Sequence, residues 1–489
     1  MSQYYTSTDH FVLIPALMLA LFGCATLLFD FLVPKQRRFL LVIVLAGLAF
    51  TGYGLYQQHS YLASSGASEI TGFNGALTID SFAIFFNWIF LVAAALVTMV
   101  SYNYLEIEGE HHGEYYALLL FAQCGMFFLA AGTDLVTLFI GLELMALSFY
   151  VLVGFLRTDK RSNEAAMKYL LLGAFSSGFL AYGFSVLYGI AGSTRLADIA
   201  VAVAARPAWD PVVFLAMATT AVGLLFKVSV APFHMWAPDA YEGAPTPVTA
   251  YLSVASKAAS FAFLLRMFWV SPGPLASARE MWEPLLVAVA VLTLTIGNLA
   301  AINQTNIKRL LAYSSISHAG YMLLGLVAGN DTGINGIAVY ILVYTFMNLG
   351  AFIVVIALRR KGVIGDDLED FAGLAQRSPL YAVLMLVFLL SLAGIPPTAG
   401  FLGKYYIFLA LLETGHYALA VFAVLWAAVA VYYYFKVVKS MFAREAAAEA
   451  PLAASFGLRL ALGASGLLTL GIGIYPEPFL RLAQTSLMR

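Results

Sequence analysis

The sequence predicts an all-α polytopic membrane protein with about fourteen transmembrane helices, and three observations support this fold class. Of its 489 residues, 62% are hydrophobic and 11% are charged, whereas a soluble domain is about half apolar and about a quarter charged. The mean hydropathy is +0.86. About fourteen runs approach the length of about 20 apolar residues that crosses a bilayer. So little polar surface excludes soluble, disordered and nucleic-acid-binding proteins.

The expected spans begin near residues 11, 38, 78, 115, 134, 165, 211, 246, 282, 309, 334, 379, 416 and 457. The first run is longer than the core of a signal peptide and no basic segment precedes it, so we expect a retained span. Residues 1–489 form a single transmembrane domain because no linker divides them. Cys24 and Cys124 stand alone, which predicts neither a disulfide nor an iron–sulfur cluster.

Basic residues predict the orientation, because cytoplasmic loops carry an excess of Lys and Arg. With the N-terminus outside, 17 of the 26 fall in one set of loops, and Lys227, Lys257 and Lys404 lie within spans. The other set of loops holds Arg195, Arg206, Arg266, Arg279, Arg481 and Arg489. We therefore expect both termini to face away from the cytoplasm and an even number of spans, a condition that twelve spans also meet.

The segment between the third and fourth expected spans, residues 106–114, reads Glu-Ile-Glu-Gly-Glu-His-His-Gly-Glu. Histidine and carboxylate side chains are ligands that a metal ion accepts. We nevertheless favour a solvated connecting loop, and we expect no metal site in this chain.

Four ionisable residues lie inside expected spans: Glu143, Lys227, Lys257 and Lys404. A charge at the centre of a helix costs about 2.5–3.5 kcal/mol on insertion scales. Such residues usually face a bundle interior or a wet cavity, and they mark ion pathways. Two simpler explanations stay open, namely that Lys227 and Lys404 snorkel to the surface and that Glu143 and Lys257 form a structural ion pair.

Proline segments interrupt two hydrophobic runs, at residues 231–238 beside Lys227 and at residues 393–400 beside Lys404. Proline removes a helical hydrogen bond, and at membrane depth the freed carbonyl groups must face protein or water. A broken helix beside a buried lysine is the usual architecture of a midplane ion site in transporters.

The two breaks also indicate internal symmetry. Pro232 and Pro396 lie 164 positions apart. This spacing is the one expected of two inverted repeats of five helices each, at approximately residues 115–270 and 282–442.

Two histidines are candidates for a proton relay, because histidine titrates near neutral pH. His318 has Ser314 at i−4 and Tyr321 at i+3, which makes a polar stripe in an apolar span suited to holding water. A histidine that only completes hydrogen bonds is the alternative. His234 follows Lys227 by seven residues and shares its face only if the helix continues through the proline segment.

Burial disfavours a charged lysine and a nearby carboxylate favours it, so a lysine whose partner approaches and withdraws can bind and release a proton. Glu143 and Lys227 are candidates for such a pair, and Lys257 or His318 can pass the proton to Lys404. Cofactor-binding motifs are missing, since no GxGxxG follows a strand and the segment before Lys404 fails as a P-loop. The energy source must therefore come from a partner.

Three segments carry a family resemblance. Residues 225–248, LFKVSVAPFHMWAPDAYEGAPTPV, resemble the core signature of the proton-translocating subunits of respiratory complex I and of related cation/proton antiporter subunits. Residues 306–321, NIKRLLAYSSISHAGY, are similar to a second signature of that family. Residues 391–404, SLAGIPPTAGFLGK, look most like the N-type subunits of bacterial NADH:quinone oxidoreductase.

The resemblance implies fourteen helices in two inverted five-helix repeats. It implies that Glu143 and Lys227 form the coupling pair, that Lys257 connects, and that Lys404 is the lysine on the release side. It further implies that electrons pass from NADH to quinone in other subunits, which hold FMN and iron–sulfur clusters. The expected partners are an antiporter-like neighbour, small membrane subunits and the lipid of a bacterial inner membrane.

Two alternatives remain at this stage. In the first alternative, the chain is a subunit of a multi-subunit Na⁺/H⁺ antiporter, and its gene then lies among those of small antiporter subunits. In the second alternative, the chain is a membrane scaffold whose buried charges only lock helices together. Replacing Lys227 would then reduce assembly and leave pumping intact.

Overall fold

The computed structural model of the protein describes residues 5–33, 37–270, 273–359, 365–445, 452 and 455–487. Four basic residues of the charge count, Lys35, Arg360, Lys361 and Arg489, lie outside the described residues.

The α-helices are α1 Ser7–Leu32, α2 Arg38–Ser65, α3 Ser81–Glu108, α4 Gly113–Ala131, α5 Leu135–Val153, α6 Lys160–Ala191, α7 Leu196–Ala204, α8 Pro211–Lys227, α9 Trp236–Gly243, α10 Thr246–Tyr251, α11 Lys257–Phe268, α12 Arg279–Ile302, α13 Ile307–Ala328, α14 Asp331–Leu358, α15 Leu374–Arg377, α16 Pro379–Ala393, α17 Ala399–Glu413, α18 Tyr417–Ala443, α19 Phe456–Ile474 and α20 Glu477–Leu487. The shorter elements are the strands β1 Glu69–Gly72 and β2 Leu77–Asp80, the 3₁₀ turns Phe73–Gly75, Ala276–Ala278 and Leu368–Phe371, and a π-helical turn, Leu252–Ser256.

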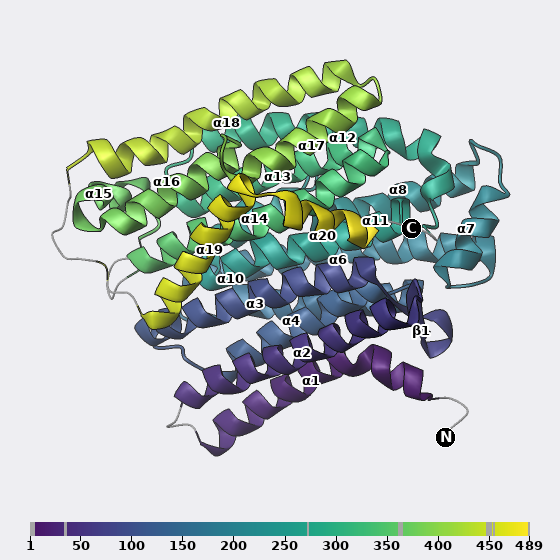
Figure 1. The fold of residues 1–489 in the computed structure, drawn as a ribbon, viewed down its shortest axis with the longest axis horizontal. Coiled ribbons are helices and arrows are strands. Elements are labelled where there is room, and N and C mark those ends of the chain that lie inside the picture. The colour runs from purple at the N-terminus through teal and green to yellow at the C-terminus, as the bar shows by residue number, and fades with distance from the viewer. Residues whose placement is uncertain are drawn as a thin grey trace.

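These helices form one bundle (Figure 1). Helices α1 and α2 lie at one edge and α18 lies at the opposite edge, while α19 and α20 cross the face toward the viewer. The candidate site lies between the edges, because α5, α8, α11, α13 and α17 carry its residues.

The helix lengths agree with the expected spans. Within the described ranges, 12 helices are long and apolar enough to cross a membrane, and each begins within a few residues of an expected start. The two remaining starts, near residues 211 and 379, coincide with the shorter apolar helices α8 and α16. Both are short because each ends inside the bundle, where a proline segment follows.

Close packing of small residues holds α4 against α5. A Cβ atom on Gly125 would lie 2.5 Å from the backbone nitrogen of Met145, and one on Gly141 would lie 2.7 Å from Cβ of Phe128. Membrane helices associate through such small residues because lipid supplies no hydrophobic driving force between them. This contact fixes the position of α5, which carries Glu143.

A small hairpin departs from the all-α expectation. Strands β1 and β2 pair antiparallel, with Ile70 opposite Ile79. Asp80 then caps α3, since its carboxylate accepts a hydrogen bond from the N–H of Ala83 at 2.7 Å. The span expected from residue 78 therefore begins at Ser81. The period-2 pattern is only four residues long on each strand, too short to stand out beside the apolar runs.

Candidate functional site: a line of buried lysines

The first broken helix stops inside the bundle at Lys227. Ser229 has a φ of +62°, in the left-handed region, and the chain becomes helical again at Trp236. The Trp236 indole N–H donates a hydrogen bond to the carbonyl oxygen of Phe226 at 2.9 Å. A carbonyl group freed by the break is thus satisfied by protein, as membrane depth requires.

Glu143 belongs to α5 and Lys227 bonds to that helix, but the two side chains do not bond to each other among the described residues. Lys227 is 4% exposed, and its Nζ donates to the Tyr150 hydroxyl at 3.3 Å. The half-buried Glu143 accepts a 2.5 Å hydrogen bond from Ser177 of α6. Among the contacts of the described residues there is no direct ion pair between Glu143 and Lys227. Tyr150 lies seven residues beyond Glu143, two turns along the same helix face, so helix periodicity could have identified it.

Lys257 lies at the end of the π-helical turn. Its Nζ donates to the backbone oxygen of Ser315 at 2.6 Å and to the Ser315 Oγ at 2.5 Å. Neither Ser253 nor Ser260 bonds to Lys257, because Ser253 accepts from Asn348 and Ser260 donates to a backbone carbonyl of its own helix. Ser253 stands four residues before Lys257, the spacing that brings side chains together on an α-helix, but the intervening π-helical turn takes more residues per turn, so this spacing does not apply.

The polar stripe expected on α13 is present and extends onto two further helices. His318 Nδ1 lies 2.6 Å from the Tyr340 hydroxyl of α14, and Nε2 lies 3.1 Å from the Tyr434 hydroxyl of α18. Tyr434 also shares a hydrogen bond with Ser314. Ser315, which bonds to Lys257, and Ser314, which bonds to Tyr434, are adjacent on α13, but no hydrogen bond joins the two serines among the described residues.

Lys404 closes the second break. Helix α16 ends at Ala393, Gly394 adopts a φ of +86°, and the chain becomes helical again at residue 399. The Lys404 Nζ donates to the carbonyl oxygens of Leu392 at 3.1 Å and Ala393 at 2.7 Å, and it lies 5.0 Å from the centre of the Tyr321 ring. The carbonyl end of a helix carries partial negative charge, which stabilises a cation.

The snorkelling explanation for Lys227 and Lys404 is wrong, because each is only 4% exposed and donates to a group inside the bundle. A helix-locking ion pair between Glu143 and Lys257 is also wrong, because their hydrogen-bond partners are Ser177 and Ser315.

A different pair shows what a structural lock is like in this bundle. Arg266 is 1% exposed, and its guanidinium donates to both Asp80 oxygens at 2.7 and 2.8 Å and to the carbonyl oxygen of Ala130. Each charge is thereby matched and hydrogen-bonded, which a buried ion pair requires. The charge count placed Arg266 in a loop, because it lies near the end of an apolar run. Its partner Asp80 is 186 residues away in the sequence, so no local pattern reveals the pair.

His234 lies in the non-helical segment 228–235, so it does not share a helix face with Lys227. Its Nδ1 is buried and has no hydrogen-bond partner among the described residues. The structure therefore brings His318 into the line of buried lysines and does not connect His234 to it by a hydrogen bond.

The segment of residues 106–114 is shorter as a loop, and less solvated, than expected. Helix α3 extends to Glu108, whose carboxylate accepts hydrogen bonds from Arg359 at 2.5 and 2.9 Å. His111 is only 4% exposed and lies 3.2 Å from the Tyr116 hydroxyl. The expectation of a solvated loop is therefore wrong for Glu108 and His111, because other side chains cover them.

One group of side chains in the described part of the chain has the composition of a metal site. Asp30 of α1 meets His112 and Glu114, and one possible ligand atom of each lies within 4.8 Å of the other two. Sequence spacing could not show this, because Asp30 comes from another helix. The expectation that the chain binds no metal stays a prediction.

Comparison with known proteins identifies relatives along the whole chain. The family described as "NADH:quinone oxidoreductase/Mrp antiporter, TM" matches residues 132–430. A protein of Solibacter usitatus named NADH-quinone oxidoreductase subunit N 2 is 74% identical, over 100% of this chain and 99% of its own length. One of Trichlorobacter lovleyi named NADH-quinone oxidoreductase subunit N is 44% identical, over 99% and 98%.

Solved structures of similar fold come from two kinds of assembly. A chain of respiratory complex I from Thermus thermophilus is 33% identical with a TM-score of 0.79, covering 96% of this chain and 99% of that one. A chain of the Mrp complex from Dietzia has a TM-score of 0.83 over 98% and 97%, at 22% identity. The second likeness shows the fold alone.

Proposed function

This chain belongs to the NADH:quinone oxidoreductase/Mrp antiporter family of membrane subunits, and we propose that its line of buried lysines translocates protons. It is a multi-pass membrane-arm subunit of NADH:quinone oxidoreductase, since relatives of that name match nearly its whole length at 44% and 74% identity. Electron transfer belongs to other subunits of the complex, which hold the FMN and iron–sulfur clusters. This chain supplies the proton path.

One observation carries the proposal: within the described ranges, the hydrogen bonds of the buried Lys227, Lys257 and Lys404 include no carboxylate partner, whereas the equally buried Lys308 lies 3.7 Å from the carboxylate of Asp366. The first three donate only to neutral oxygens, on Tyr150, on Ser315 and at the end of α16. A buried cation without a counterion is costly, and in membrane proteins such groups mark ion pathways. The same bundle contains the ion pair of Arg266 and Asp80, which joins α11 to the start of α3. A structural role would give each buried lysine a carboxylate partner of this kind.

The contacts support a proposed order of the path. Glu143 and Lys227 are the coupling pair, because Glu143 belongs to α5 and Lys227 bonds to Tyr150 of the same helix. Lys257 is the connecting lysine, and the hydrogen-bonded group of Ser314, Tyr434 and His318 begins one residue from its partner Ser315. Lys404 is the release-side lysine and faces Tyr321 on the same helix as His318.

Paired local structures support the proposal of two inverted five-helix repeats. Asp134 and Asn306 each cap a helix and each pair with the segment after the next helix, at Arg195 and at Asp367. Packing repeats as well, because α6 lies against α8 and α9 while α14 lies against α16 and α17. The left-handed residue before each break, Ser229 or Gly394, adds a third correspondence.

The test is proton pumping by the purified complex in proteoliposomes. We expect Lys227→Ala, Lys257→Ala and Lys404→Ala each to assemble and to lower the rate of NADH-driven proton uptake at least about tenfold, the effect of removing one essential proton carrier. Lys436→Ala is the matched control, because its Nζ also bonds to a backbone carbonyl but is only half-buried. Unchanged uptake in all three lysine variants would contradict the proposal.

The antiporter alternative is distinguished by redox activity. Its support is the Mrp likeness, which at 22% identity concerns the fold alone. A complex that contains this chain should oxidise NADH with a water-soluble quinone, whereas a Na⁺/H⁺ antiporter should be redox-silent.

For orientation, we propose that both termini lie on the periplasmic side of a bacterial inner membrane. The support is the excess of Lys and Arg in the opposite set of loops.

A further inference from the structure

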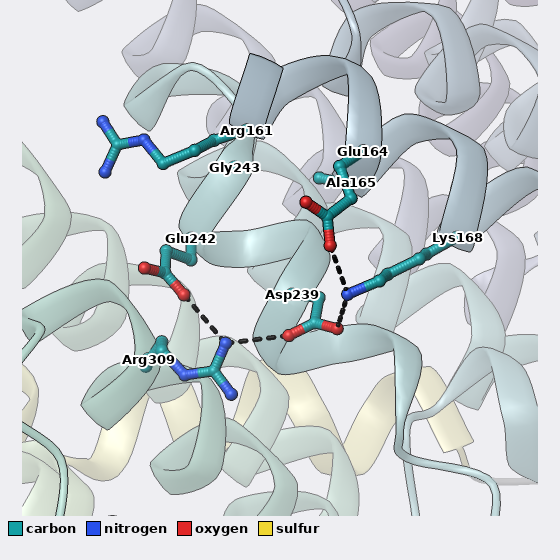
Figure 2. A pocket seen from close by; sticks show the side chains of 8 residues that line it. All are labelled: Arg161, Glu164, Ala165, Lys168, Asp239, Glu242, Gly243 and Arg309. Carbon is teal, nitrogen blue, oxygen red and sulfur yellow. Dashed lines mark hydrogen bonds and ion pairs between the residues drawn. The ribbon is translucent and has the colours of Figure 1, made fainter. Parts of the chain in front are cut away.

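Five charged residues from three helices meet beside a cavity of about 220 Å³ that Arg161 also lines (Figure 2). Glu164 and Lys168 belong to α6, Asp239 and Glu242 belong to α9, and Arg309 belongs to α13. We name this group the α9 ion cluster. Neither the proton path nor the sequence patterns account for it.

Asp239 is the centre of the α9 ion cluster. One of its oxygens accepts from Lys168 at 2.8 Å and the other accepts from Arg309 at 2.8 Å. Figure 2 shows the carboxylate lying between the two cations. Asp239 therefore ties α9 to α6 and to α13 at once. Glu164 and Glu242 each bond to only one of the cations, at 2.8 Å.

The α9 ion cluster joins the two signature segments. Asp239 lies in residues 225–248, and Arg309 lies in residues 306–321. A second contact supports the same junction, since the buried Lys308 donates to the carbonyl oxygen of Ala244 at 2.8 Å. The joined elements, α9 and α13, belong to different proposed repeats.

Helix α9 contacts residues next to Lys227 and Lys257. At its start, the indole of Trp236 bonds to the carbonyl of Phe226, the residue before Lys227. Five residues later, the Tyr241 hydroxyl lies 3.5 Å from Oγ of Ser315, which accepts a hydrogen bond from Lys257. The helix is only eight residues long, so a shift at Asp239 displaces both contacts.

We propose that Asp239 is a positioning residue for proton translocation: by pairing with Lys168 and Arg309 it fixes α9 between the two repeats, and α9 in turn sets the geometry of Lys227 and Lys257. This inference rests on the proposed function. It adds a link by which a displacement in one repeat reaches a lysine of the other.

The test compares three variants of the assembled complex in proteoliposomes, with NADH oxidation and proton uptake measured together. Asp239→Asn should lower the protons moved per NADH about threefold to fivefold, the factor expected from one partly buried ion pair. Asp239→Glu should restore much of the ratio. Glu164→Gln is the matched control, because it also removes a carboxylate from Lys168 but links residues of α6 only.

A double-mutant cycle gives a second measurement. Asp239→Asn and Arg309→Gln, which remove directly paired charges, should be strongly non-additive in the proton-to-NADH ratio, whereas Glu164→Gln and Arg309→Gln, which do not contact each other, should couple much less. If Asp239→Asn does not assemble, Lys168→Gln replaces it, since Lys168 is 45% exposed and its loss removes only one of the two ties.

The outcomes separate this inference from the proposed function. An unchanged ratio in assembled Asp239→Asn, or a loss equal to that of Glu164→Gln, would overturn the positioning role. A drop in assembly with a normal ratio in the complex that does form would reduce Asp239 to a structural role. If Lys227→Ala loses pumping while Asp239→Asn gives any of these outcomes, the proposed function stands and only the role of Asp239 changes.

Discussion

Ser315 holds the buried Lys257 through two hydrogen bonds. It offers Lys257 two acceptors, its backbone oxygen and its Oγ. Ser315→Ala keeps the first and removes the second. A hydrogen bond to a charged group contributes about 1.5–3 kcal/mol, so we expect the proton-pumping rate of the complex to fall about tenfold, measured in proteoliposomes at saturating NADH.

Ser317→Ala is the control at the same scale. Its hydroxyl bonds to the amide of Asn298 and to no lysine, although it lies on the same helix and is equally buried. We expect its pumping rate to stay within about twofold of the unmodified complex, because the loss of one neutral hydrogen bond costs only about 1 kcal/mol. Equal losses in the two variants would show that Ser315 acts through helix packing instead.

At the scale of elements, we expect the stability of the loop between α3 and α4 to depend on pH through His111. Burial, followed by the charge of Arg37, lowers the pKa of His111 to about 4, from the ordinary value of about 6.5. Between these values the unfolded chain binds more protons than the folded one, so stability falls as the pH falls from about 6.5 to 4. The shift sets an upper bound of about 3 kcal/mol.

Thermal unfolding of the purified complex from pH 7 to pH 5 measures this effect, read as local release of the loop. We expect His111→Gln to flatten the pH dependence, because glutamine can still hydrogen-bond to Tyr116 and does not titrate in this range. His59→Gln is the control, since His59 is exposed on α2. A pH dependence that survives in His111→Gln would assign it to other groups.

At the scale of the whole molecule, the sequence predicts where the chain crosses the membrane but not which groups meet. Hydropathy located the spans, and prolines located both breaks, because these are properties of contiguous residues. The partner of Lys257 lies 58 residues away on another helix, and the partner of Asp80 lies 186 residues away. No periodicity encodes such distances. The π-helical turn before Lys257 also escapes any pattern that assumes 3.6 residues per turn.

The outer face of α5 carries a consequence for the assembled complex. Val136, Ile140, Leu147 and Val151 are each more than half exposed, and the half-buried Glu143 lies among them. A carboxylate in an apolar stripe at membrane depth is not stable against lipid. We therefore expect a neighbouring membrane subunit to cover this face.

Cysteine labelling in the membrane tests that coverage. In a Cys24→Ser background, which removes the exposed native thiol, Leu147→Cys should be labelled by a lipid-soluble aryl diazirine when the chain is expressed alone, because the carbene inserts into an S–H bond and needs no thiolate. In the complete complex the same thiol should be protected at least about tenfold, because a packed helix interface excludes the reagent. The buried native Cys124 reports any general unfolding, since it should stay unreactive in both states. Equal labelling of Leu147→Cys in the two states would mean that α5 faces lipid, and Glu143 would then need its charge satisfied within this chain, by Ser177 and Lys227.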